Sequence, residues 1–284
     1  MATSTNDLSI VLSGGIANIN PLNSIGGEAS SYPVTSGVIN NLFPDVTADQ
    51  SEAGHEDYRC VYIFNDGEKI LYNIKLWIFE DPDGGATSYL GIENRNEIQR
   101  LILTGTMTGG SISFSYLNGT VTFDSAYESD LSIWASQLQE TLRSLTDDND
   151  NLYFDDVEVL AQNSSNNTII FDIKFVGINS RRNFETIVIT ENNLEPLNSI
   201  DANLTTTHQG APVNTVAIEI NVDTTPPGGV TFTAPTQSSP IIIPYLNPDD
   251  GFPLWIKRSV LENTDAVDSD YVRIIVTSSL LKPS

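Results

Sequence analysis

Short segments in which every second residue is apolar recur along most of this chain, and turn-forming residues end each of them. Residues 58–65 and 271–277 alternate in this way, as do residues 111–117 just before Asn118 and Gly119. Alternation with a period of two is typical of strands that bury one face, and an Asn-Gly pair is typical of a tight hairpin. The pattern therefore predicts a mainly β protein built from antiparallel sheets.

Asp66 and Gly67 separate residues 58–65 from the next apolar segment, residues 70–79, and the turn-forming sequence DPDGG follows at 81–85. Asp-Gly pairs favour the tight turns that join adjacent antiparallel strands. We therefore expect residues 58–65 and 70–79 to form a hairpin.

Residues 130–145 form the one segment with helical periodicity. Its apolar residues recur in steps of three and four and give a single hydrophobic stripe: Leu131, Trp134, Leu138, Leu142 and Leu145. Ser129 or Asp130 can cap the start of this helix. Strand patterns precede and follow it. Residues 96–213 are therefore expected to form a small inserted α+β module, with one helix on an antiparallel sheet.

Strand patterns of the first kind return after this module, at residues 216–222, 254–260 and 271–277. Neither outer part of the chain alone has enough strands for two packed sheets. We therefore predict an antiparallel β-sandwich split in sequence, made of residues 1–95 and 214–284, with 96–213 inserted in one of its loops. Such an insertion costs little free energy.

The charge of the chain is strongly unbalanced. It has 13 Lys and Arg residues against 37 Asp and Glu residues, which gives a formal net charge of −24 at pH 7. A field of this sign repels phosphate backbones, so we expect no nucleic-acid partner. No segment has the apolar length of a membrane-spanning helix, and the first residues do not have the pattern of a secretory signal. We therefore expect no membrane partner and folding in a cytoplasm.

Two stretches of the outer parts carry a recognisable pattern. The first stretch opens with Leu42-Phe43 and Asp45-Val46, continues through an acidic loop that contains Gly54, and leads into a strand that begins Asp57-Tyr58-Arg59-Cys60. The second stretch is one strand with three matching residues: Trp255, Arg258 and Val260. Both stretches resemble segments of a family of tailed-bacteriophage virion proteins. Lys257 stands where that family has a second Arg, which keeps the charge but loses the planar fork of a guanidinium.

The inserted module resembles a repeat found in phage and bacterial structural and surface proteins. The matching landmarks keep their order across the module: Asn96-Glu97-Ile98-Gln99, Thr108-Gly109-Gly110, Phe114, Asn118-Gly119, the helix, Ile173 to Phe175, and Thr205 to Gly210.

The resemblance implies a non-enzymatic structural component of a tailed phage virion, in the tail, neck or baseplate region. Such a protein would act through assembly interfaces with other virion proteins, in several copies per particle, after synthesis in the host bacterial cytoplasm. Two alternatives stay open. One is a capsid head decoration or cement protein, and the other is an adhesin module that binds host glycans.

The inventory of catalytic groups favours a protein that is not an enzyme. The only two histidines, His55 and His208, lie far apart in polar segments, and Cys60 is the one cysteine. Cys60 alternates with apolar residues in a strand pattern, so we interpret it as a small core residue and not as a nucleophile.

One acidic segment offers a candidate metal site. Oxygen donors fall at calcium-loop positions one, three, five, nine and twelve, counted from the first: Asp147, Asn149, Asn151, Asp155 and Glu158. Leu152 occupies the sixth position, which favours glycine, and the segment joins a helix to a strand, unlike an EF-hand. Asp and Asn also favour turns, so the alternative is a simple acidic connection. We expect no cofactor other than this candidate calcium ion.

Two further groups have alternative interpretations. Trp77, Trp134 and Trp255 fit buried faces of strands or the helix better than an exposed glycan-binding surface. Arg181 and Arg182 are a basic pair in an acidic module and either dock an acidic neighbour or lie in a solvated loop.

Overall fold

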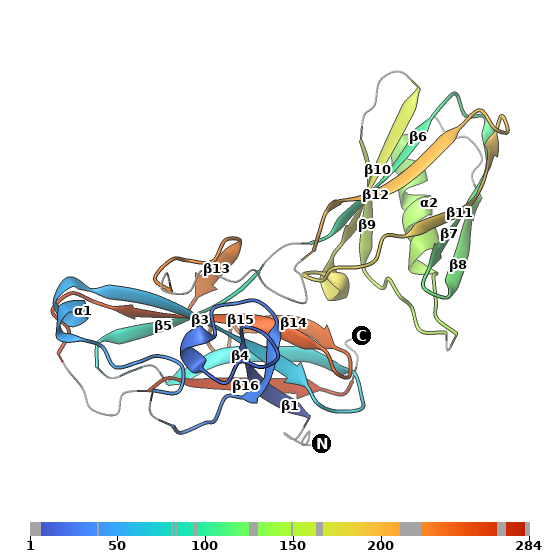
Figure 1. Cartoon of the computed structure of the whole chain (residues 1–284). Coiled ribbons are helices and arrows are strands. Elements are labelled where there is room, and N and C mark those ends of the chain that lie inside the picture. Colours follow the sequence, from blue (N-terminus) through green and yellow to red (C-terminus); the bar gives the residue numbers. More distant parts are fainter. Residues whose placement is uncertain are drawn as a thin grey trace. The chain divides into compact units, whose positions relative to one another are not determined.

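A computed structural model describes residues 7–38, 40–80, 82, 84–93, 96–124, 130–148, 150–162, 167–210, 223–265 and 271–281. The chain divides into two compact units (Figure 1). The sandwich unit comprises residues 1–94 and 213–284, and the inserted unit comprises residues 95–212. The boundaries predicted from the sequence lie one residue further along the chain. The predicted strand at 216–222 lies outside the described residues.

The sandwich unit contains two antiparallel sheets. The larger sheet has the order β13-β5-β15-β3-β1-β2. Its strands are β1 (Leu8–Ser13), β2 (Ala29–Pro33), β3 (His55–Asn65), β5 (Ala86–Glu93), β13 (Val230–Thr233) and β15 (Gly251–Val260). The smaller sheet has the order β14-β4-β16, with β14 (Ile241–Leu246), β4 (Leu71–Glu80) and β16 (Arg273–Ser279). Two short helices, η1 (Pro21–Asn23) and α1 (Ala48–Ala53), lie in connections.

Both sheets need strands from both outer parts of the chain. β15 lies between β3 and β5, and β4 lies between β14 and β16. Apolar side chains of the two sheets form one core between them: Val61, Ile63, Leu71, Ile74, Leu76, Leu90, Ile92, Ile243, Leu246, Phe252, Leu254 and Ile256. The predicted fold class, mainly β with a sandwich split in sequence and an inserted α+β module, is confirmed.

The predicted hairpin between residues 58–65 and 70–79 is wrong. β3 pairs with β1 and β15 in the larger sheet, whereas β4 pairs with β14 and β16 in the smaller one. The Asn65 side chain donates hydrogen bonds to the carbonyls of Lys69 (2.8 Å) and Leu246 (3.1 Å). These bonds fix the chain where it crosses from one sheet to the other. The turn at Asp66 and Gly67 therefore joins two layers and not two neighbouring strands.

The inserted unit contains two sheets and the long helix α2 (Leu131–Arg143). One sheet has the order β12-β6-β10-β9, with β6 (Ile98–Thr104), β9 (Val157–Gln162), β10 (Thr168–Phe175) and β12 (Asp201–His208). The other has the order β11-β7-β8, with β7 (Gly109–Tyr116), β8 (Gly119–Asp124) and β11 (Val188–Glu195). A short helix, η2 (Gly177–Asn179), precedes β11.

Helix α2 packs between the outer strands β8 and β9 of the two sheets, while β11 and β12 approach each other at the opposite side (Figure 1). The predicted stripe faces the common core, where Trp134, Leu138, Leu142 and Leu145 are all fully buried. The Asp130 carboxylate caps the helix by accepting a hydrogen bond from the backbone N–H of Ser132 (2.9 Å). The module therefore has two sheets where the simplest prediction had one.

The entry and exit of the inserted unit lie side by side. Ile98 at the start of β6 pairs with His208 at the end of β12. In the sandwich unit, Glu93 at the end of β5 pairs with Val230 at the start of β13. Each unit thus brings its two connecting ends together, which is the geometry that an insertion into the β5–β13 connection requires.

Candidate functional site: the arginine clamp

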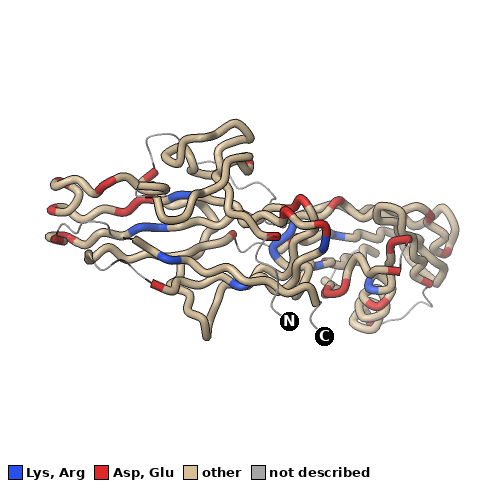
Figure 2. The backbone as a smooth tube through the Cα atoms, turned by 90° about the horizontal axis from the view of Figure 1, so that it is seen from below, with Lys and Arg blue, Asp and Glu red and all other residues tan. Residues whose placement is uncertain are grey.

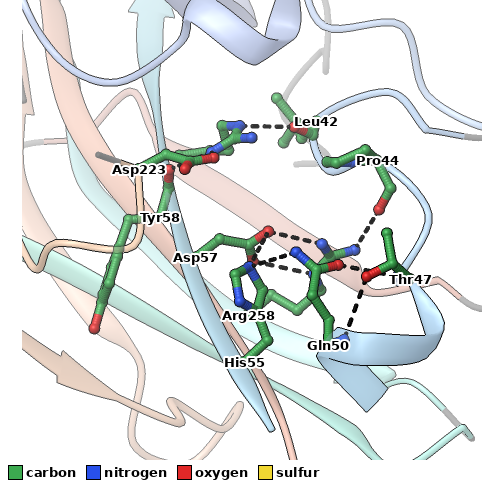
Figure 3. A network of polar contacts seen from close by, with 10 residues as sticks. Leu42, Pro44, Thr47, Gln50, His55, Asp57, Tyr58, Asp223 and Arg258 are labelled. Atoms are coloured by element: carbon green, nitrogen blue, oxygen red, sulfur yellow. Dashed lines mark hydrogen bonds and ion pairs between the residues drawn. The ribbon is translucent and has the colours of Figure 1, made fainter. Parts of the chain in front are cut away.

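Two arginines on neighbouring strands of the larger sheet organise the segment that carries the virion-family pattern. β3 and β15 pair so that Arg59 lies opposite Ile256 and Arg258 lies opposite Asp57. Both side chains reach the connection that leads into α1 (Figure 3). We call Arg59, Arg258, Phe43 and their partners Asp57 and Asp223 the arginine clamp.

Arg258 binds Asp57 through both arms of its guanidinium group. Nε donates to Oδ1 at 3.1 Å and Nη2 donates to Oδ2 at 2.7 Å. The remaining Nη1 donates to the carbonyl of Pro44 at 2.7 Å. Asp57 is 2 % exposed, so its carboxylate depends on these charge-assisted bonds to replace water. Arg258 therefore fixes both the strand β3 and the connection before α1.

Arg59 is buried and binds three groups. Its Nε donates to the carbonyl of Leu42 at 3.0 Å, and its Nη1 donates to the carbonyl of Tyr58 at 2.8 Å. Nη1 also donates to Oδ2 of Asp223 at 2.8 Å. Asp223 belongs to the part of the chain that follows the inserted unit. Arg59 thus joins the two separated parts of the sandwich unit across the insertion.

The ring of Phe43 contacts both arginines. The guanidinium carbon of Arg258 lies 4.8 Å from the ring centre, and that of Arg59 lies 5.4 Å from it. A cation over an aromatic face is stabilised by the ring quadrupole, more strongly when both groups are shielded from water. Leu42 and Phe43 therefore supply a carbonyl and a ring to the same pair of cations.

Helix α1 brings His55 to the edge of the clamp. Thr47 and Gln50 form a reciprocal capping box at the start of the helix. The Gln50 side chain also lies 3.1 Å from Nε2 of His55, and that nitrogen is 3.8 Å from Oδ2 of Asp57 (Figure 3). His55 therefore belongs to a structural polar network.

Cys60 lies on the opposite face of β3, under the connection between β1 and β2. It packs with Tyr58, Tyr62 and Trp255 and is fully buried. Burial raises the pKa of its thiol well above the ordinary range, so the thiolate needed for nucleophilic chemistry does not form at neutral pH. The interpretation of Cys60 as a core residue is confirmed.

The candidate calcium residues are only partly brought together. The Asp147 carboxylate accepts hydrogen bonds from the backbone N–H of Asn151 (2.9 Å) and from its side-chain amide (3.0 and 3.2 Å). Asp155 lies in the connection to β9, and the exposed Glu158 lies on β9 opposite Lys174. Asn149 lies outside the described residues.

Within the part of the chain that the structure describes, no group of three or more His, Cys, Asp or Glu side chains has a metal-binding arrangement. The Asp147–Asn151 bonds close a tight turn, which is the alternative role that Asp and Asn have in such connections. The calcium site stays a prediction.

A buried polar cluster in the inserted unit explains the Asn96–Gln99 landmark, for which the sequence indicates no role. Glu97 is fully buried and accepts hydrogen bonds from the side chain of Gln99 and from the backbone N–H of Phe184, both at 2.6 Å. Gln99 also binds the backbone of Glu185 (2.9 Å) and Ile187 (2.8 Å). Burial raises the pKa of Glu97, and these hydrogen bonds oppose that shift. The cluster fixes the segment that leads into β11.

The tryptophans and the basic pair at 181 and 182 differ in how deeply they are buried. Trp134 and Trp255 are fully buried, and Trp77 is partly buried on the smaller sheet. The backbone N–H of Arg181 donates to the Asn96 side chain at 3.2 Å, and burial lowers the pKa of the Arg181 guanidinium. Arg182 lies beside it in the same connection. The two buried tryptophans cannot form a glycan-binding surface.

No protein-family model matches this chain, and a search of curated proteins gives no match either. Among the described residues, neither of the α-helices is both long and apolar enough to span a bilayer.

Proposed function

We propose that this chain is a non-enzymatic structural component of a tailed-phage virion, in the tail, neck or baseplate region, that works through assembly interfaces with other virion proteins. The observation that carries the proposal is the arginine clamp. Leu42, Phe43, Asp57, Arg59 and Arg258 are landmarks of the virion-family pattern, and all of them act in one scaffold. Their contacts bind backbone carbonyls and carboxylates of the sandwich unit to one another, which is the role of a scaffold.

The division into two units also supports an assembly role. Each unit has its own apolar core, so each can present a stable surface to a different neighbour. Acidic residues lie along both units, and Lys and Arg residues are far fewer (Figure 2). A basic surface on a neighbouring virion protein would be attracted to them, whereas nucleic acid would be repelled.

The alternative of a head decoration protein uses the same surfaces and differs in copy number. The copy number of a ring protein in the tail or neck is a small multiple of the ring's rotational symmetry. The copy number of a decoration protein rises with the area of the shell. The adhesin alternative requires aromatic residues that gather on an exposed surface. Phe79 and Tyr271 are exposed aromatics on the smaller sheet and beside it.

Quantitative mass spectrometry of particles purified from the bacterial culture that makes the chain tests the proposal. We expect the chain in the particle fraction at a fixed, low copy number. Absence from purified particles would contradict the proposal. A copy number in the range of the major capsid protein would favour decoration of the head, and binding of the isolated chain to host envelope glycans would favour the adhesin.

A further inference from the structure

Helix α1 is held at its start by a pair of reciprocal hydrogen bonds. The backbone N–H of Thr47 donates to Oε1 of Gln50 at 3.0 Å, and the backbone N–H of Gln50 donates to Oγ1 of Thr47 at 3.3 Å. This capping box gives acceptors to two donors that the helix itself leaves unpaired. The oxygen of the Gln50 amide is therefore committed to the backbone, which fixes the orientation of the amide nitrogen.

The amide nitrogen of Gln50 faces His55 (Figure 3) and lies 3.1 Å from Nε2 of the imidazole. An amide nitrogen only donates hydrogen bonds, so Nε2 has to be the acceptor, and it can accept only when it carries no proton. The capping box of α1 therefore fits the neutral form of His55, with its proton on Nδ1.

A buried carboxylate lies near the same nitrogen. Oδ2 of Asp57 is 3.8 Å from Nε2 of His55, and the side chain of Asp57 is 2 % exposed. Arg258 already donates to both oxygens of this carboxylate. The distance of 3.8 Å is too long for a hydrogen bond, so Asp57 would attract an imidazolium charge without accepting its Nε2 proton.

His55 is surrounded by α1, β3, β15 and the connection after β15. It pairs with Val260 of β15, and the Ser51 hydroxyl of α1 donates to the carbonyl of Thr264. The His55 side chain is 18 % exposed, so protons reach it without unfolding. Among the titratable and charged side chains of these segments, His55 is the one whose type ordinarily changes charge between about pH 8 and about pH 5. The others are Asp45, Asp49, Glu52, Glu56, Asp57, Lys257, Arg258, Glu262 and Asp265.

We propose that His55 is a pH sensor that opens the start of α1 in acid. Protonation turns Nε2 into a donor that faces a second donor, the Gln50 amide nitrogen. The nearest acceptor is then Oε1 of Gln50, and the amide turns over to offer it. The Thr47 N–H loses its acceptor, and the capping box is broken. The inference goes beyond the virion role and does not rest on it.

Exchange of the Thr47 amide hydrogen with water, measured by NMR in the purified full chain, tests the proposal. We expect its protection, corrected for the pH dependence of exchange in unstructured peptides, to fall at least fivefold between about pH 7.5 and about pH 5. His55→Phe should abolish the fall, because it removes the titrating ring. His208→Gln removes the other histidine of the chain and is the matched control, which should keep the fall.

A second variant keeps the test decisive if His55→Phe does not fold. Gln50→Glu retains the capping box, and its carboxylate accepts from the Thr47 N–H and from a protonated His55 at once. This variant should therefore stay closed across the whole range although His55 is present. The inference is overturned if the native chain shows no fall, if His55→Phe or Gln50→Glu keeps the fall, or if His208→Gln loses it. Absence of the chain from phage particles would not affect these results.

Discussion

At the scale of single residues, the arginine clamp shows why so many landmarks of residues 42–60 belong together. Arg59 and Arg258 each donate three hydrogen bonds to carbonyls and carboxylates, and Phe43 lies against both. A lysine could not replace either, because an ammonium group lacks the planar fork. The acidic landmark Asp45 and its neighbour Val46 are exposed, and no clamp contact explains them.

Arg258→Ala is expected to destabilise the sandwich unit by about 3–5 kcal/mol, because it leaves the buried Asp57 carboxylate without its main partner. Urea unfolding monitored by tryptophan fluorescence measures the change. Lys257→Ala is the matched control. Lys257 lies on the same strand as Arg258 and forms a more exposed ion pair with Glu56 of β3, so its loss should cost less than about 1 kcal/mol. Equal losses for the two variants would show that the fork has no special role.

Glu97 predicts a distinctive pH dependence for the inserted unit. Its pKa is raised in the folded state, so the folded state binds this proton more tightly than the unfolded chain. The free energy of unfolding should therefore rise as pH falls through the folded pKa toward the unfolded value of 4.5, and it should drop as pH rises. The difference in stability between the native chain and Glu97→Gln, measured across this range, isolates the effect. The native chain should gain stability relative to Glu97→Gln as pH falls, and a native chain that loses stability relative to this variant as pH falls would refute the assignment.

The partners of these residues could not be predicted from the sequence. Arg258 lies 201 positions from Asp57, and Phe184 lies 87 positions from Glu97. Local patterns carry no signal for pairs so far apart. Burial of Cys60, by contrast, follows from its place in an alternating strand, and that prediction is confirmed.

At the scale of elements, periodicity predicts which segments are strands or helices but not which strands pair. The hairpin of β7 and β8 follows from Asn118 and Gly119, and the helix follows from its apolar stripe. β4 pairs with β14 and β16, which lie more than 150 positions away in the chain, and no local pattern reveals such pairing. The same limit applies to β11 and β12, which follow each other in the chain yet belong to different sheets.

Trp134→Ala is expected to destabilise the inserted unit by about 3–5 kcal/mol, because a fully buried indole leaves a cavity between α2 and the sheets. Thermal unfolding by calorimetry measures the loss. The neighbouring Ile133 is 43 % exposed, and Ile133→Ala on the same helix should cost less than about 1 kcal/mol. If the two substitutions cost the same, the helix does not pack as described.

At the scale of the whole molecule, the chain is two folded units joined through one connection of the sandwich. In each unit the two connecting ends lie side by side: Ile98 with His208 in the inserted unit, and Glu93 with Val230 in the sandwich unit. We therefore expect each unit to fold without the other. Residues 95–212 should fold alone, and the sandwich unit should fold when a short Gly-Ser linker replaces them. Cooperative unfolding of each separate piece is the expected result. A piece that lacks a cooperative transition would mean that the units depend on one another.

The function itself belongs to this scale, because copy number and neighbours are properties of an assembly. The most direct test is a cryo-electron microscopy reconstruction of particles made in the culture that expresses the chain. We predict density that fits the sandwich unit in the tail, neck or baseplate, with repeated copies in contact with other virion proteins. A complete particle map with every density assigned to other chains would contradict the account.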